Sequence, residues 1–516
     1  MADKKDKTGR NIKKLSNEHP SASIDHTKEQ LNQLRHMVNE SAQFGEQLNQ
    51  AVAKLRQVAA PEGQPFIFTN SLAENKKLLK VVFRDCADVK MRGFTFGNNK
   101  ALLVYLDGMT DTRVLEENII KPLGSESGGS SETGNETNPV SVKGLPDMYD
   151  LINEKLSIAN VTIISQATKA IEAVMTGRAI LFIDGVPEIL AVGEVKHVKR
   201  SVESGSEDVI RGPHDAFNET LSDNIVLIRR RARDHNVKVK ILQVGERTKT
   251  SVAIMYAANL VKPGLVEEVE RRIRNIKIDR VLASLNIEEL IIDHPWSPFP
   301  QLQTTERPDK TVSAIYEGRV AILVDNTPAT ILAPATYALV MQTPEDYTTS
   351  PSVSSLIRLS RHISAFIAIY LPAIYVAIVS YHPGIMPTAM AISVAELRAR
   401  TPFPSFIEAL AMEVILEIFQ EAIIRLPSKV AGAAGVVGAL VIGSTVVEAG
   451  LVNPLLVVVI AMTAIASYTM PSWGFSMALR FFRVPVLILA SVLGLYGVMI
   501  GLLVITVHLC SMRSFG

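Results

Sequence analysis

The sequence predicts an α/β (α+β) soluble N-terminal region of two subdomains, followed by an all-α polytopic transmembrane domain. Long apolar segments without a charged residue recur from residue 363 onward and are of the length that crosses a bilayer. Before them, β-like runs alternate with helical patterns. The N-terminal segment is polar and predicts one amphipathic helix after a disordered start. We divide the chain accordingly at 1–60, 61–205, 206–350 and 351–516.

The composition of the whole chain hides the membrane domain. A net charge of +1 and 20% charged residues are typical of a soluble protein, and neither indicates binding to nucleic acid. Cys86 and Cys510 lie far apart in sequence, which gives neither a metal-binding spacing nor a disulfide framework. Residues 1–20 carry basic side chains but no apolar core, so they do not form a secretory signal. We therefore expect the soluble region to stay on the cytoplasmic side.

One strand motif occurs in both soluble subdomains. Residues 177–187 (GRAILFIDGVP) are matched by residues 318–328 (GRVAILVDNTP). Each is an apolar run that ends in Asp-Gly or Asp-Asn, and Gly and Asn tolerate the left-handed backbone of a tight hairpin turn. Another apolar run follows each turn. We expect each subdomain to be built around such a hairpin.

Acidic residues end three of the predicted strands, at Asp107, Asp184 and Asp325. Carboxylates at strand ends can be catalytic or bind metals, but turn formation explains this pattern more simply. The chain lacks the phosphate-binding, dinucleotide-binding, serine-hydrolase and zinc-protease motifs. The sequence therefore predicts that the protein is not an enzyme and has neither a metal site nor a cofactor.

Four apolar segments predict membrane-spanning helices, because backbone groups in lipid must form their hydrogen bonds internally. A shorter run at 385–394, interrupted by Pro387, fits a re-entrant or partial span. With the acidic helix described below, we expect about four to six membrane segments. The four apolar segments are 363–381, 430–447, 454–470 and 484–507.

The segment 406–424 (FIEALAMEVILEIFQEAII) is apolar enough to enter a bilayer and yet carries four glutamates. Ionisable groups at membrane depth cost about 2.5–3.5 kcal/mol each and persist mainly where they line water, ions or partners. On a helix, Glu413, Glu417 and Glu421 form one stripe, whereas Glu408 lies off it. We predict that the stripe lines a cation path.

Two other interpretations of this stripe remain open. The helix can lie along the membrane surface with its acids in water, and Arg425 then forms an ordinary i,i+4 ion pair with Glu421. Alternatively, the acids form a polar contact between subunits.

Small residues recur every four positions in the next predicted helix, and such a stripe lets membrane helices approach closely. The stripe serves either pore assembly between protomers or packing within one protomer. It consists of Ala431, Gly435, Ala439 and Gly443.

Several short motifs follow one another in a fixed order. Those of the soluble region are Arg211-Gly212-Pro213, Asn224, Glu306-Arg307-Pro308-Asp309 and Asp346-Tyr347. Those of the membrane domain are Arg425-Leu426-Pro427 and Arg513-Ser514-Phe515-Gly516. In this order they resemble the A subunits of the GerA-type spore germination receptors, from about residue 69 to the end. His214-Asp215 departs from the family's usual residues after Arg-Gly-Pro.

The resemblance implies a multi-pass protein of the inner membrane of a bacterial endospore, with its soluble region on the cytoplasmic side, facing the spore core. Such A subunits are expected to assemble with a transporter-like B subunit, with a lipoprotein C subunit and with further copies of themselves. The resemblance also implies a nutrient-gated cation channel that triggers spore germination.

Other functions remain open. A proton-coupled secondary transporter would use the same glutamates as a proton relay, although the few predicted spans show no inverted repeat. Within the family, the chain would be an accessory A-like subunit that acts with the spore dipicolinate channel. A purely scaffolding subunit would tolerate removal of all three acids.

Overall fold

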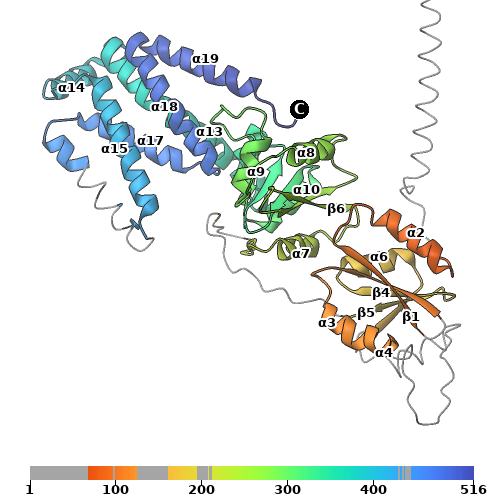
Figure 1. Cartoon of the computed structure of the whole chain (residues 1–516). Coiled ribbons are helices and arrows are strands. Elements are labelled where there is room, and N and C mark those ends of the chain that lie inside the picture. The colour runs from red at the N-terminus through yellow and green to blue at the C-terminus, as the bar shows by residue number, and fades with distance from the viewer. Residues whose placement is uncertain are drawn as a thin grey trace, which may run out of the picture. The chain divides into compact units, whose positions relative to one another are not determined.

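The computed structural model describes residues 68–96, 99–124, 161–193, 207, 212–427, 431–432, 435, 438 and 443–516 (Figure 1). The expected helix within residues 1–60 lies outside the described residues. The predicted fold class is confirmed, because two antiparallel sheets with helices are followed by a region built of helices alone.

The first sheet has five strands in the order β1-β2-β4-β5-β3, and all its pairings are antiparallel. Strands β4 and β5 are buried along their whole length, which explains their uninterrupted apolar sequences. The strands are β1 (Val89–Phe96), β2 (Asn99–Leu106), β3 (Val161–Ile164), β4 (Ala179–Ile183) and β5 (Ile189–Val192). The helical elements are α2 (Leu72–Val82), α3 (Thr112–Leu115), the π-helical turn η1 (Glu116–Ile120), α4 (Lys121–Gly124) and α6 (Ala167–Met175).

The second sheet repeats this plan, with the order β6-β7-β9-β10-β8 and antiparallel pairing throughout. Strands β9 and β10 are again fully buried. The strands are β6 (Val237–Val244), β7 (Thr250–Ala257), β8 (Gln303–Thr305), β9 (Val320–Val324) and β10 (Thr330–Ala333). The helices are α7 (Leu221–Arg231), α8 (Leu265–Arg274), α9 (Ser284–Ile291) and α10 (Pro308–Tyr316).

The strand motif found in the sequence belongs to a duplication of the whole sheet. In each copy the aspartate of the hairpin turn binds the start of the helix that opens the subdomain. Asp184 Oδ1 accepts a hydrogen bond from Leu72 N–H at 3.0 Å, and Asp325 Oδ1 accepts one from Leu221 N–H at 3.2 Å. A carboxylate at a helix N-terminus is stabilised by the unpaired N–H groups there. These aspartates therefore serve in turns and helix starts.

A second pair of side chains obeys the same duplication. Asn75 in α2 exchanges two hydrogen bonds with the backbone of Thr69, at 2.9 and 2.7 Å. Asn224 in α7 does the same with the backbone of Asn218, at 2.8 and 2.7 Å. Asn224, one of the predicted family residues, thus fixes the loop before its helix.

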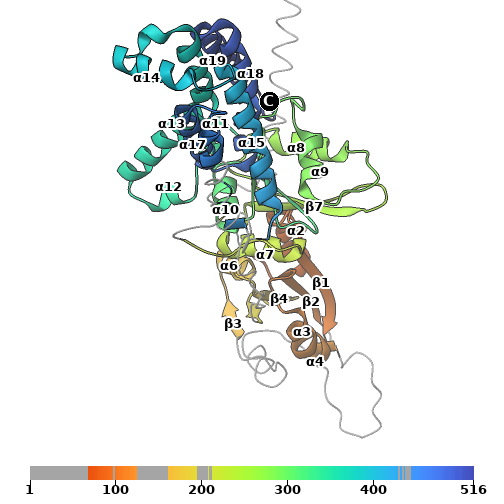
Figure 2. The same ribbon diagram turned by 90° about the vertical axis from the view of Figure 1, so that its left-hand side faces the viewer.

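The C-terminal region is helical. Two described helices, α13 and α18, are long and apolar enough to cross a membrane, and α17 and α19 are shorter apolar helices. Figure 2 shows the region from the side. Its elements are α11 (Tyr337–Val340), α12 (Glu345–Thr348), α13 (Pro351–Tyr381), the 3₁₀ turn η3 (Pro383–Ile385), α14 (Thr388–Arg398), α15 (Ser405–Arg425), α17 (Pro454–Tyr468), α18 (Trp473–Leu493) and α19 (Leu495–Ser511).

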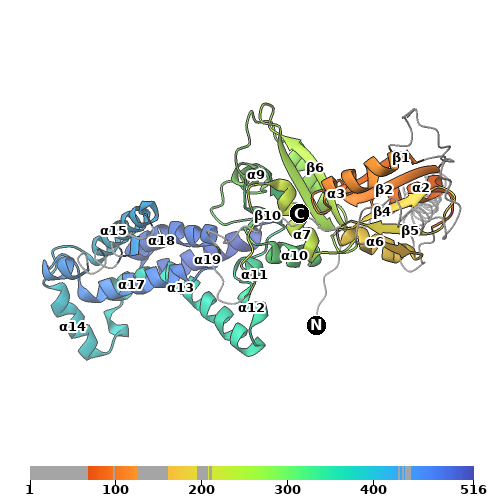
Figure 3. The same ribbon diagram turned by 90° about the horizontal axis from the view of Figure 1, so that it is seen from below.

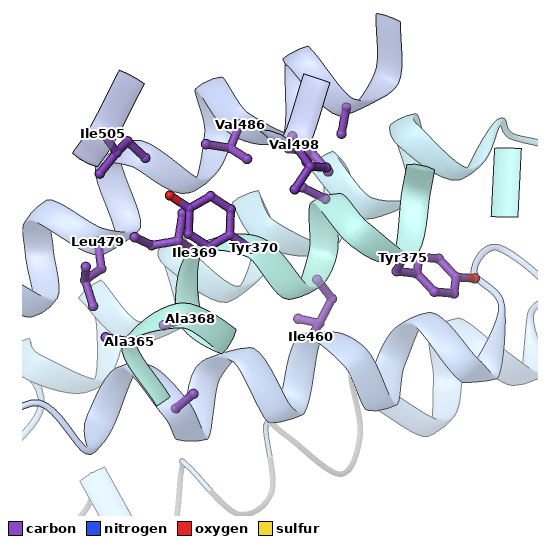
Figure 4. Close-up of a cluster of buried hydrophobic side chains, with 14 of the residues drawn as sticks. Ala365, Ala368, Ile369, Tyr370, Tyr375, Ile460, Leu479, Val486, Val498 and Ile505 are labelled. Atoms are coloured by element: carbon purple, nitrogen blue, oxygen red, sulfur yellow. The ribbon is translucent and has the colours of Figure 1, made fainter. Parts of the chain in front are cut away.

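The core of the helical region is made of small and branched side chains on α13, α17, α18 and α19. Figure 4 shows members of this cluster, among them Ala365 and Ala368 and the longer side chains of Ile460 and Leu479. Alanines allow the helix axes to approach, and the branched side chains fill the remaining space.

The predicted span 484–507 is broken into two helices. Gly494 has φ 61° and ψ −141°, a conformation that non-glycine residues rarely adopt, and it separates α18 from α19. The two helices then lie side by side (Figure 3). A Cβ at Gly497 would lie 2.1 Å from the Leu489 carbonyl oxygen, so this close contact requires glycine. Hydropathy alone predicted one straight span because it does not register a turn.

Candidate functional site in the membrane helices

The candidate site is built on α15. Its 21 residues contain neither Gly nor Pro, and Pro404 immediately precedes them. At the other end Leu426 has left the helical conformation, with ψ 145°, as expected for the residue before Pro427. The sequence thus sets both ends of the helix that carries the acidic stripe.

Glu413 is buried among the membrane helices. Its Oε2 accepts a hydrogen bond from Arg483 Nη1 at 2.6 Å. The same guanidinium donates to the Ala368 carbonyl oxygen and to Ser467 Oγ, each at 2.7 Å. Arg483 therefore connects α13, α15, α17 and α18. A buried charge of this kind is tolerated only when it is paired and hydrogen-bonded.

The other two acids of the stripe are exposed in the single chain. Glu417 has a side chain that is 54% exposed, and its Oε1 lies 3.2 Å from Arg480 Nη1. Glu421 is 57% exposed and accepts a hydrogen bond from Arg425 Nε at 2.8 Å. Each acid contacts one arginine and is otherwise open to water or to a neighbouring chain.

The stripe therefore runs from the inside of the protomer to its surface. Glu413 is enclosed, whereas Glu417 and Glu421 are open along the same helix. Glu421 and Arg425 form the i,i+4 ion pair that is expected if the helix lies along the membrane surface. Contacts within one chain do not test a cation path, which stays a prediction.

Arg480 and Arg483 were missed as partners of the stripe. They lie 63 and 70 residues from the acids they bind, so no local pattern connects them. One signal was present in the sequence. Two arginines three residues apart in an otherwise apolar helix require partners, and Glu413 and Glu417, four residues apart, offer a matching face.

Glu408 lies off the stripe, as predicted, and is also buried. Its Oε2 accepts a hydrogen bond from Asn453 N–H at 3.3 Å. Among the buried polar atoms that lack a hydrogen-bond partner in the described structure are Glu408 Oε1, Asn453 Nδ2 and the Tyr375 hydroxyl. Asn453 Oδ1 caps α17 by accepting from Leu455 N–H at 2.9 Å, which fixes its amide with Nδ2 away from that helix.

The small-residue stripe is described in part. Ala431, Gly435 and Gly443 are described, whereas Ala439 lies outside the described residues. A Cβ at Gly435 would meet Ile423 of α15 at 3.7 Å, and one at Gly443 would meet Val457 of α17 at 4.0 Å. These glycines thus contact helices of the same protomer. A role in pore assembly stays a prediction.

The family motif Glu306-Arg307-Pro308-Asp309 forms the start of α10. Arg307 is buried, binds Asp309 Oδ2 at 2.7 Å and donates to the Pro213 carbonyl oxygen at 3.3 Å. Pro308 is the first helical residue, where its missing N–H causes no loss. The Glu306 carbonyl oxygen accepts from Phe217 N–H at 2.8 Å. Arg211 lies outside the described residues.

A cavity of about 260 Å³ lies next to this motif and includes Gly212 and Pro213 in its lining. Two buried arginines line it, Arg307 and Arg319, and burial lowers the pKa of Arg319 to about 10. Arg319 donates to the Pro334 carbonyl oxygen and to Gln303 Oε1, each at 2.9 Å. Arg178, its counterpart in the first subdomain, also donates to a backbone carbonyl of the neighbouring strand. The shared arrangement indicates a structural arginine in both subdomains.

The last soluble motif connects to the first membrane helix. Asp346 is buried and binds Arg361 Nη1 of α13 at 2.7 Å and Arg358 Nε at 3.3 Å. Burial raises the pKa of the Asp346 carboxyl, but the hydrogen bonds from Arg361, Thr343 N–H and Arg358 and the charge of Arg361 together outweigh it, so the pKa is lowered overall. Tyr347 donates its hydroxyl to Gln342 Oε1 at 2.6 Å.

The end of the chain makes a second connection. Ser514 Oγ donates to the Gln301 carbonyl oxygen at 2.7 Å. Phe515 N–H donates to Asp293 Oδ2 at 2.7 Å, and the Phe515 ring lies 4.3 Å from the Arg272 guanidinium. The residues after α19 are therefore fixed to the second soluble subdomain. Among the described residues, no group of three or more His, Cys, Asp or Glu side chains is placed to hold a metal ion.

Comparison with known proteins gives one consistent result. The family model described as Bacillus/Clostridium GerA spore germination protein matches residues 77–516. Spore germination protein B1 of Bacillus subtilis (strain 168) is 37% identical over 87% of this chain and 90% of its own length. Spore germination protein A1 of the same organism is 40% identical over 71% of this chain and 76% of its own length.

Two further relatives complete this picture. The uncharacterized membrane protein YfkQ of B. subtilis is 37% identical over 86% of this chain and 85% of its own length. The crystal structure of the N-terminal domain of the A subunit of the Bacillus megaterium spore germinant receptor GerK3 is 28% identical. It covers 53% of this chain and 98% of that domain, with a TM-score of 0.41.

Proposed function

Because the chain belongs to the GerA family of spore germination proteins, the A-subunit family of the germination receptors, we propose that it forms a nutrient-gated cation channel. The channel would assemble from several copies of this chain in the spore inner membrane. A transporter-like B subunit and a lipoprotein C subunit would complete the receptor. The soluble region would lie on the side of the spore core.

The acidic stripe of α15 carries this proposal. Glu417 and Glu421 are exposed on α15, which contacts the candidate membrane spans α13 and α18, and at membrane depth a carboxylate without water or a partner is costly. A water-filled path between protomers would hydrate both acids and would favour cations over anions. Glu413 has a different role in this proposal, because Arg483 already neutralises it inside the protomer.

The two connections to the soluble region support gating. Asp346 fixes the start of α13 and Asp293 fixes the residues after α19, so a displacement of the second subdomain would act on both ends of the membrane region. A trigger shifts a closed–open equilibrium only if it favours the open arrangement. Rearrangement of the partner subunits would supply this preference.

Potassium release from spores on nutrient addition tests the proposal. The receptor would be expressed in a strain that lacks other germination receptors. With Glu417→Gln and Glu421→Gln combined, we expect potassium release to fall several-fold at unchanged receptor level. The same substitution at the exposed Glu396 of α14 serves as the control and should leave release unchanged. Glu413→Gln should instead lower the receptor level itself.

The same assay separates the proposal from its main alternatives. Unchanged release in the double variant would remove the two acids from the conduction path and favour a scaffolding subunit. A proton-coupled transporter would release potassium at a rate that follows an imposed pH gradient, whereas a channel's release would follow the potassium gradient alone.

A further inference from the structure

An apolar cavity lies at the end of the first membrane helix. It measures about 570 Å³, is open on one side, and is bordered by the end of α13, by η3 and α14, and by the segment before α15. Most of its lining residues are of apolar types, with Val379, Met386, Val394 and Phe403 among them. A volume of this size accommodates a small ligand or one chain of a lipid.

One charged side chain lines this cavity. Arg398, the last residue of α14, has its Nε buried and without a hydrogen-bond partner in the described structure. The nearby buried carboxylate of Glu408 accepts its hydrogen bond from Asn453 N–H and not from Arg398. A buried guanidinium N–H without an acceptor is costly, and an anion bound to Arg398 would supply that acceptor.

The surroundings of the cavity indicate the boundary between lipid tails and headgroups. Only Val394 of α14 is buried, while Met390 and Ile392 of the same helix are exposed. A short helix with exposed apolar side chains and an arginine at its end fits the membrane interface. Tyr381, at the end of α13, is also exposed here, as expected for an aromatic side chain at headgroup level.

We propose that this cavity binds an anionic phospholipid, with one acyl chain against the apolar wall and the phosphate on the Arg398 guanidinium. The apolar wall favours a lipid over free phosphate. The Arg398 guanidinium, whose Nε has no hydrogen-bond partner in the described structure, favours an anionic lipid over an apolar helix of a second copy. A basic side chain in a pocket between membrane helices is a known form of lipid headgroup recognition.

Lipid retention by the full-length protein tests this proposal. The protein is purified in detergent, mixed with phosphatidylglycerol or phosphatidylcholine, and examined by native mass spectrometry. We expect retained phosphatidylglycerol, with about tenfold weaker retention in Arg398→Gln, the loss expected for one charge-assisted contact. Arg398→Lys should restore part of it. The control is Arg400→Gln, an exposed arginine that does not line the cavity and should retain lipid as the wild type does.

A second variant addresses the cavity without removing charge. Ala395→Trp fills the cavity from an exposed position of α14, and we expect it to weaken phosphatidylglycerol retention while the thermal unfolding temperature stays unchanged.

Excess inorganic phosphate should not displace the lipid. Equal retention of both lipids, or equal loss in Arg398→Gln and Arg400→Gln, would show non-specific surrounding lipid. Loss of oligomers in Arg398→Gln at unchanged lipid retention would identify a second copy as the occupant. Each of the last three results, equal retention of both lipids, equal loss in the two arginine variants, or loss of oligomers at unchanged lipid retention, would overturn the proposal.

Discussion

Three buried arginines hold separate parts of the molecule together. Arg229 binds Asp88 at 2.7 Å, and Arg361 and Arg483 bind Asp346 and Glu413. The first pair joins the second subdomain to the strand that opens the first sheet, the second joins the soluble region to α13, and the third joins four membrane helices. Each guanidinium also donates to at least one backbone carbonyl, which satisfies a further donor.

The pair of Asp346 with Arg361 is the sharpest test of this arrangement. Asp346→Ala leaves Arg361 buried with only the Met341 carbonyl and the Thr343 hydroxyl as partners. We expect a loss of about 3–5 kcal/mol in the free energy of unfolding, measured by thermal unfolding of the protein in detergent. Glu345→Ala, at the neighbouring position, is the control and should cost much less. An equal loss in the two variants would contradict this role for the ion pair.

The same carboxyl determines a dependence on acid. Because its pKa is lower in the folded protein than in the unfolded chain, the pair contributes fully above the unfolded pKa near 4. The contribution is lost as the pH falls through the lowered pKa of the folded state. The difference in stability between wild type and Asp346→Asn should therefore shrink in strong acid. A difference that stays constant with pH would exclude the titration of Asp346 as its source.

Glu288 in α9 should show the opposite dependence. Burial raises its pKa to about 7, and the neighbouring charge of Glu289 adds to the shift. The carboxyl is therefore most favourable to folding below its unfolded pKa, and this contribution is lost as the pH rises through about 7. Glu288→Gln should stabilise the protein by about 1–3 kcal/mol at pH 8 and hardly at pH 4, measured by thermal unfolding. Glu289→Gln should give a smaller gain of the same sign.

Two glycines allow the close contact in the hairpin of α18 and α19. A Cβ at Gly494 would lie 2.9 Å from the His382 ring, and one at Gly497 would lie 2.1 Å from a backbone oxygen. Gly497→Ala should therefore destabilise the protein by about 1–3 kcal/mol because the two helices must separate. Gly384→Ala adds the same methyl group where no atom lies within 4 Å and serves as the control. Equal thermal unfolding of the two variants would refute this tight contact.

Local patterns predicted the soluble elements better than the membrane site. The strand-and-turn motif of residues 177–187 and 318–328 is confirmed because a hairpin is specified by its own turn residues. The acidic helix was equally visible, since its ends are set by Pro404 and Pro427. The partners of its acids were not, because Arg480 and Arg483 approach α15 only through the packing of α18. The two arginines in an apolar helix show only that partners are needed, and the sequence does not identify which acids those partners are.

The membrane region of the whole molecule is fixed to the second soluble subdomain at both of its ends. Asp346 and Arg361 make the connection at the start of α13. After α19, Asp293 binds Phe515 N–H and, through its other oxygen, Arg272 at 2.6 Å. The His508 ring adds a contact to Ser297 Oγ at 2.9 Å. Such fixed points at both ends allow a rearrangement of the soluble region to reach every membrane helix between them.

Breaking only the C-terminal connection should separate sensing from ion release. Asp293→Ala removes the acceptor for Phe515 N–H and the partner of Arg272, but it leaves the membrane helices and the Asp346–Arg361 pair intact. If the closed–open equilibrium is shifted through both connections, potassium release on nutrient addition should fall several-fold at an unchanged receptor level. Lys277→Ala, at an exposed position of the same subdomain, should release potassium as the wild type does. If Asp293→Ala releases potassium normally, the soluble region acts on the membrane helices only through the start of α13. The loss of potassium release in Asp346→Ala should then be as large as the loss caused by breaking both connections.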